Sequence, residues 1–152
     1  MFLATNNQVV YDKNGLKIVN YLPHKTDSDN ENSIITLLTY KDFKMLFTGD
    51  ANVNSINSIL NYLPTGITVL KVPHHGAKNS VDESIMAKLN PTYSIISVGE
   101  NKFGHPNLYT LHLLKKTEIL RTDVNNSIKI IVNKKGYKIL NFDILRKKYV
   151  KF

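Results

Sequence analysis

The sequence predicts an α/β fold in which helices pack on a mixed β-sheet. Two observations lead to this prediction: strand-like apolar runs dominate the first 48 residues, and helical and strand-like patterns alternate from Gly49 onward. Strands followed by alternating units of this kind are typical of a sheet covered by helices. With 152 residues and 42% hydrophobic content, the chain is expected to form a single domain spanning 1–152.

The first strands are predicted from β-branched and apolar runs bounded by turns. Gly15 to Tyr21 forms one such run, and 33–40 and 43–48 form two more. Lys41-Asp42 separates the latter two runs, which indicates a tight β-hairpin. The polar stretch 26–32 between the first and second runs is expected to be a surface loop.

Later elements are predicted from apolar spacing and from helix-capping patterns. The spacing of Val53, Ile56, Ile59 and Leu60 indicates one helix. The capping box Ser80 to Glu83 indicates the start of a second helix, which should end before Pro91. A third helix is indicated by Pro106 followed by Leu108, Leu111 and Leu114. Buried strands are expected at 68–72, 93–98 and 118–121, and a hairpin at 128–140 with its turn at 133–136. Residues 142–152 are expected to be a basic C-terminal tail.

Composition limits the chemistry that the chain can perform. The sequence has no cysteine, so any metal must be held by histidine, carboxylate or amide groups. The formal charge of +8 favours polyanionic partners such as nucleic acid or acidic lipid surfaces, although a compositional bias towards Lys, Asn and Ile would produce the same charge. No secretory signal or bilayer-spanning apolar run is present in the sequence, so the default expectation is a cytoplasmic location.

Three polar clusters follow three successive predicted strands. They are Thr48-Gly49-Asp50, His74-His75-Gly76 and Gly104-His105-Pro106. In open α/β sheets, ligands bind outside the carboxyl ends of the strands, and Asp and His are ligands for zinc or manganese. Each cluster also has a structural explanation: Asp50 or His105 can cap a helix, and the paired histidines can be polar loop residues. Their joint occurrence favours a site, whereas His24 and His112 lack supporting context and are expected to be surface or packing residues.

The ordered set of motifs resembles the metallo-β-lactamase-like domain of ComEC-type competence proteins. The matching segments are Asn32-Ser33, Leu46 to Asp50, Leu70 to Gly76, Ile95 to Gly99, Gly104 to Pro106, Arg121 to Asp123 and Ser127 to Ile130. The resemblance implies an αββα metallo-β-lactamase fold, of which this chain contains mainly the C-terminal half. It also implies a hydrolase that degrades DNA during uptake, in a domain attached to a membrane channel protein.

The resemblance implies roles for individual residues around two divalent metal ions, zinc or manganese. Asp50 matches an aspartate that bridges or ligates the metals, His75 matches a ligand of the second metal, and the adjacent His74 is a further candidate ligand. His105 matches a histidine that contacts a phosphate oxygen or protonates the leaving group. Asp50 and His105 are thus the candidate catalytic residues. The candidate substrate-binding residues are Asn32, Ser33, Lys78 and His105.

One motif of the family is missing from the sequence. The early His-x-(His or Asp)-x-Asp-His pattern has no counterpart in 1–31, so we expect weak metal binding or none, and no activity by this chain alone. The chain is then a fragment, a domain completed by a partner chain, or a degenerate form. The alternatives are a non-catalytic nucleic-acid-binding or phosphate-binding α/β module. A half-domain should also expose an apolar sheet face, so self-association is expected.

Overall fold

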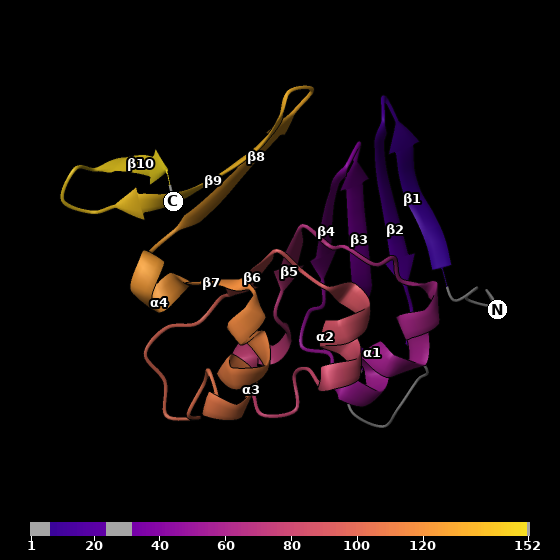
Figure 1. Cartoon of the computed structure of the whole chain (residues 1–152), viewed down its shortest axis with the longest axis horizontal. Coiled ribbons are helices and arrows are strands. Elements are labelled where there is room, and N and C mark those ends of the chain that lie inside the picture. Colours follow the sequence, from indigo (N-terminus) through magenta and orange to yellow (C-terminus); the bar gives the residue numbers. More distant parts are fainter. Residues whose placement is uncertain (1–6, 24–31, 152) are drawn as a thin grey trace.

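A seven-stranded mixed sheet forms the centre of the computed structural model, which describes residues 7–23 and 32–151 (Figure 1). Its strands, in spatial order, are β1 (Asn7–Lys13), β2 (Leu16–Tyr21), β3 (Ile35–Tyr40), β4 (Phe43–Phe47), β5 (Val69–Lys71), β6 (Tyr93–Ile96) and β7 (Glu118–Arg121). Strands β1 to β4 pair antiparallel, and β4 to β7 pair parallel. The prediction of a mixed sheet in an α/β fold is confirmed.

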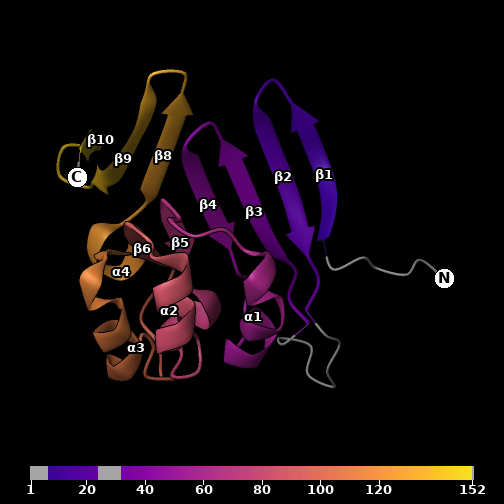
Figure 2. The same ribbon diagram turned by 45° about the vertical axis from the view of Figure 1, so that its right-hand side comes forward.

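Helices cover one face of this sheet (Figures 1 and 2). They are α1 (Val53–Ile59) with the 3₁₀ turn η1 (Leu60–Tyr62), α2 (Glu83–Leu89), and α3 (Leu108–Leu113) with η3 (Leu114–Lys116). Ile56, Ile85 and Leu114 are completely buried and pack in one cluster with Leu46 and Leu70 of the sheet. Within the described residues, no helix is long and apolar enough to cross a membrane.

A smaller three-stranded sheet packs on the opposite face. It consists of β8 (Ile128–Asn133), β9 (Gly136–Asp143) and β10 (Lys148–Lys151), all antiparallel in the order β10-β9-β8. Ile139 of β9 is buried against Val69, Ile95 and Leu120 of the large sheet. The predicted hairpin at 128–140 is therefore present, and the basic tail 142–152 includes the end of β9 and the whole of β10.

Several local predictions differ from the structure. Helix α2 is capped by Asp82, whose Oδ1 accepts a hydrogen bond from the Ile85 amide at 2.8 Å, and not by Ser80, whose hydroxyl donates to the Pro73 carbonyl. Helix α3 begins after Asn107, so Pro106 precedes the helix, and Leu108 is 82% exposed. Strand β1 and the short helix α4 (Thr122–Asn125) were not predicted. His24 and residues 26–31 of the predicted loop lie outside the described residues.

Candidate functional site

The three polar clusters follow parallel neighbouring strands at one edge of the large sheet. The register aligns Phe47 of β4 with Lys71 of β5, and Lys71 with Ile95 of β6. The carboxyl ends of these strands therefore lie level with one another. The loops that follow them carry Asp50, the paired histidines and His105 to the same edge.

Asp50 lies in a turn that β4, β5 and Ser33 hold in place. The Thr48 hydroxyl donates to the Lys71 carbonyl at 2.6 Å, and the Asp50 amide donates to the Ser33 hydroxyl at 3.1 Å. Gly49 has φ +54°, and a Cβ there would lie 2.9 Å from the Ser33 Cβ, so this turn requires glycine. The side chain of Asn52, and not that of Asp50, caps helix α1. The capping explanation for Asp50 is therefore wrong.

His74 and His75 both adopt left-handed backbone conformations in the 3₁₀ turn η2 (Pro73–Gly76). Their φ angles are 46° and 54°, a geometry that costs each non-glycine residue about 1–3 kcal/mol and persists only where neighbours enforce it. Backbone hydrogen bonds supply that enforcement. The His74 amide donates to the Gly49 carbonyl at 3.2 Å, and the Asn107 amide donates to the Gly76 carbonyl at 2.8 Å.

The ring of His75 is oriented by a backbone carbonyl. Its Nδ1 lies 2.7 Å from the Ser97 carbonyl oxygen, which can only accept, so Nδ1 carries the proton and donates. The lone pair of the neutral ring is then on Nε2. Histidines that bind metals through one nitrogen and donate from the other to a carbonyl follow this pattern. His75 thus has the tautomer that a metal ligand needs.

His105 lies beside His74 in the loop between β6 and α3. The His74 and His105 ring centroids are 5.7 Å apart, and Phe103 stacks on His105 at 5.9 Å. The His105 Nδ1 is buried and has no hydrogen-bond partner within the described part of the chain. Burial lowers the pKa of His105, and the nearby His74 and His75 lower it further. Asn107 caps α3, so the capping explanation for His105 is wrong as well.

Two residues of this region were not predicted. Asn101 holds the His105 loop, because its side chain accepts from the His105 amide at 3.1 Å and donates to the His105 carbonyl at 2.7 Å. Such local side-chain to backbone bonds are characteristic of asparagine in loops, so the residue type was a usable signal. Lys71 is half-buried at the end of β5. Burial lowers its pKa, and the Asp50 carboxylate opposes that shift, which puts a cation within electrostatic reach of Asp50.

The remaining candidates lie at varying distances from this centre. Ser33 contacts the Asp50 turn, and Asn32 precedes it in the half-buried turn before β3. Lys78 is exposed and lines a separate pocket with Asn52, Asp82 and Tyr109. Asn32, Ser33 and Lys78 remain predictions as substrate-binding residues.

The donor types of this edge suit a divalent metal, but their number does not complete a site. Asp50 offers a carboxylate and His75 an Nε2 lone pair, both common zinc ligands. Among residues 7–23 and 32–151, however, no three His, Asp or Glu side chains lie in a group that could hold an ion. A catalytic zinc site uses three protein ligands and one open position. The described residues therefore do not form a closed ligand set.

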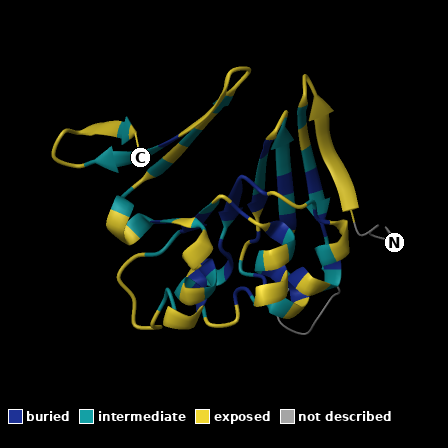
Figure 3. Ribbon diagram, viewed as in Figure 1, coloured by how far each residue is buried: buried dark blue, intermediate teal, exposed yellow. Residues whose placement is uncertain are grey.

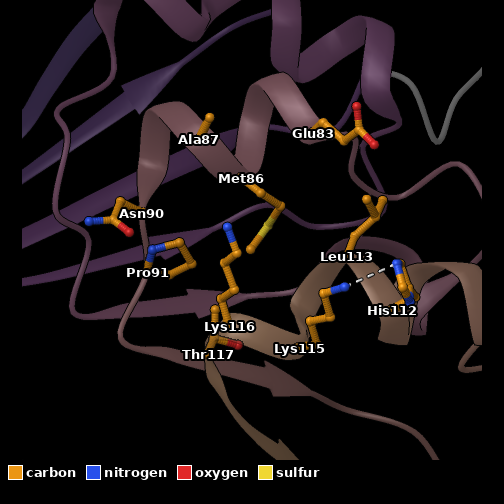
Figure 4. Close-up of a pocket in the computed structure, with 10 residues that line it drawn as sticks. All are labelled: Glu83, Met86, Ala87, Asn90, Pro91, His112, Leu113, Lys115, Lys116 and Thr117. Carbon is orange, nitrogen blue, oxygen red and sulfur yellow. Dashed lines mark hydrogen bonds between the residues drawn. The ribbon is translucent and has the colours of Figure 1, made fainter.

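A pocket elsewhere in the molecule has no connection with this edge. It lies between α2 and the α3–η3 segment, and Glu83, Met86 and Lys116 are among its lining residues (Figure 4). His112 also lines it, with Nε2 3.3 Å from the Lys115 Nζ. The pocket includes Asn90-Pro91 just before β6 and Thr117 just before β7, so it sits at the amino ends of these strands, opposite the edge that carries His75 and His105.

Comparisons with known proteins bear on the family and the fold of the chain. No family model matches the chain. ComE operon protein 3 of Bacillus subtilis (strain 168) is 35% identical over 105 residues, which cover 66% of this chain and 14% of that protein. Recombination protein 2 of Haemophilus influenzae is 30% identical over 113 residues, which cover 71% of this chain and 14% of that protein.

The fold has a solved counterpart. A proposed Zn-dependent hydrolase of the metallo-β-lactamase superfamily from Thermotoga maritima aligns with a TM-score of 0.52 and 17% identity, over 75% of this chain and 68% of that one. The chain carries a metallo-β-lactamase-fold domain of the ComEC type. This ComEC-type domain matches only 14% of the length of each of the two curated relatives.

Proposed function

We propose that this ComEC-type domain contributes the C-terminal part of a metal-dependent phosphodiesterase site that acts on DNA. The observation that carries the proposal is His75, whose Nδ1 is held on the Ser97 carbonyl so that Nε2 carries the lone pair at the edge where Asp50 lies. Two consecutive left-handed histidines support it, because strain of this kind is found at functional sites. The name of one relative, a recombination protein, favours nucleic acid as the substrate class.

In this proposal Asp50 and His75 are metal ligands, and His74 is a further candidate. His105 faces the substrate, where it contacts a phosphate oxygen or supplies a proton to the leaving group. A second segment, from this polypeptide or from a partner, supplies the early motif and the rest of the ligands. The isolated 152-residue chain then binds zinc or manganese weakly and does not cleave DNA, because two ligands leave an ion largely to solvent.

The test compares the chain alone with a protein in which a segment carrying the early motif precedes it. Metal binding is measured by isothermal titration calorimetry, and cleavage with a labelled oligonucleotide. Joining should give metal-dependent cleavage. Asp50→Ala should abolish cleavage, and His75→Ala should weaken metal binding while the fold remains intact. His112→Ala and Asp42→Ala are matched controls outside the edge and should leave both properties unchanged.

Two results contradict the proposal. Tight stoichiometric metal binding and DNA cleavage by the isolated chain would mean that a complete ligand set exists within it. Undiminished cleavage by the joined Asp50→Ala protein would remove Asp50 from the site. The alternative function, a non-catalytic phosphate-binding or nucleic-acid-binding module, predicts binding of the oligonucleotide by the joined protein without any metal-dependent cleavage.

A further inference from the structure

The positive charge of the chain is concentrated in the three-stranded sheet. Eight of the 20 Lys and Arg residues and one of the 12 Asp and Glu residues lie in 126–152, so this segment has a formal charge of +7 and the rest of the chain +1. The β9–β10 hairpin within it extends away from the large sheet on the side of α4 (Figures 1 and 2). The projecting hairpin therefore belongs to a strongly cationic three-stranded sheet, whereas the rest of the chain is nearly neutral.

The turn of this hairpin exposes two large aliphatic side chains. Figure 3 shows the turn between β9 and β10 in the colour of exposed residues. Within it, Ile144 is 61% exposed and Leu145 is 96% exposed. Asp143 fixes the turn, because its Oδ1 accepts from the Arg146 amide at 2.9 Å and its Oδ2 lies 3.5 Å from the Arg146 Nε. Asp143 is the only acidic residue in 126–152, and it is paired with a cation of the same turn. The turn geometry therefore directs both apolar side chains into solvent.

The order of residue types along the hairpin matches the depth profile of a lipid interface. Two aliphatic residues at the tip are followed by Arg146, Lys147 and Lys148, and then by Tyr149. Tyr149 packs on Phe142 with ring centroids 5.3 Å apart, and the Lys129 Nζ lies 5.2 Å from the Tyr149 centroid. Interfacial anchors place aliphatic groups in the acyl boundary, cations at the phosphates, and tyrosine at the headgroup level. Nucleic acid would attract the same cations, but it offers no apolar phase for Leu145.

We propose that the β9–β10 hairpin docks on a membrane surface that contains anionic lipid. Ile144 and Leu145 enter the boundary between headgroups and acyl chains, and Lys147 and Lys148 contact lipid phosphates. Each cation near such a surface strengthens binding about fivefold, and each buried methylene about fourfold. The proposal is independent of the hydrolytic function, because it uses none of the residues Asp50, His74, His75 and His105.

The first test uses co-sedimentation of the 152-residue chain with vesicles at physiological salt. Vesicles of phosphatidylcholine alone are compared with vesicles that also contain phosphatidylserine. Lys147→Gln/Lys148→Gln should weaken binding to the anionic vesicles by roughly 25-fold. The matched control is Lys134→Gln/Lys135→Gln, which removes the same charge from the exposed turn between β8 and β9 and should change binding only a few-fold. If both double variants lost vesicle binding equally, the binding would depend on net charge alone and not on the β9–β10 hairpin, which would overturn the proposal.

The second test follows insertion directly. The chain contains no tryptophan, so Leu145→Trp introduces a unique fluorescent reporter at the tip. Its emission should shift to the blue with anionic vesicles, whereas Leu108→Trp, at an 82% exposed position of α3, should not shift. Ile144→Ser/Leu145→Ser should weaken vesicle binding at least about tenfold. These positions are exposed, so loss of folding does not confound the result.

An unshifted Leu145→Trp emission would overturn the proposal, as would unchanged vesicle binding by the double serine variant. A nucleic-acid surface is the competing outcome. In that case Lys147→Gln/Lys148→Gln would weaken oligonucleotide binding, and the serine substitutions at Ile144 and Leu145 would leave vesicle binding unchanged. This result too would overturn the membrane proposal.

Discussion

Gly76→Ala tests whether the two histidine loops depend on a close backbone approach. Gly76 ends the turn that carries His74 and His75, and it has φ +80°. A Cβ at this position would lie 2.8 Å from the Pro106 Cβ and 3.3 Å from the Pro106 Cα. Two penalties follow. Alanine in the left-handed region costs about 1 kcal/mol, and forcing the Pro106 loop away costs about a further 1–3 kcal/mol.

Gly104→Ala is the matched control for this substitution. Gly104 lies two residues before Pro106 and has φ +72°, but a Cβ there would meet nothing within 4 Å. Gly104→Ala should therefore lower the free energy of unfolding by only about 1 kcal/mol, the conformational penalty, whereas Gly76→Ala should lower it by about 2–4 kcal/mol. Urea unfolding followed by circular dichroism measures both free energies. Equal losses in the two variants would refute the reasoning, because they would mean that the His75 and His105 loops do not press on each other.

Two further predictions follow from the electrostatics. Asp82→Ala should destabilise the chain by about 1 kcal/mol at neutral pH in urea unfolding. Burial raises the Asp82 pKa, but hydrogen bonds from the Ile85 amide, Asn57 and Ser84 outweigh it and lower the pKa below its ordinary value. The charge-dependent part of the difference between wild type and variant should therefore be fully present above the unfolded pKa and be lost as pH falls through the lowered folded value. If the chain binds DNA, binding of a labelled oligonucleotide should weaken steeply with salt, because counterion release drives it. No binding even at low salt would remove DNA as the favoured partner.

Local patterns predicted most of the sheet and failed where side chains are not buried. Strand β3 begins with alternating buried and half-buried residues, and β4, after a two-residue turn, carries the buried Phe43 and Leu46, so both strands could be predicted from their apolar residues. Strand β1 is exposed along its whole length and shows no such alternation. Its signal was the turn Asn14-Gly15, where both residues have positive φ, because this dipeptide strongly favours a two-residue hairpin. The β1–β2 hairpin was not predicted, because the residues of β1 do not form an apolar face.

The site was predictable at the level of loops but not of contacts. Clusters that follow parallel strands reach a common edge, which the sequence order alone indicates. The bonds that orient the side chains join residues far apart in sequence: Ser33 with Asp50, and His75 with Ser97. No local pattern encodes such pairs. Helix caps were ambiguous for a related reason, since Asp50 and Asn52 are both good caps and only the backbone path shows that Asn52 caps α1.

The uncovered part of the large sheet indicates where further ligands would have to approach. The β8–β9 hairpin packs on Phe43, Val69 and Leu120, on the face opposite the helices. Phe47 ends β4 on that same face, because side chains alternate along a strand, yet it is 38% exposed. Within the described residues, the apolar surface next to the Asp50 turn is thus left partly open. A segment that buries Phe47 would approach the Asp50 turn, which follows Phe47 in the chain, whereas one that packs on the helical face would be separated from Phe47 by the sheet. The same open surface is the physical basis for the expected self-association, because a second copy can cover Phe47 when no completing segment does.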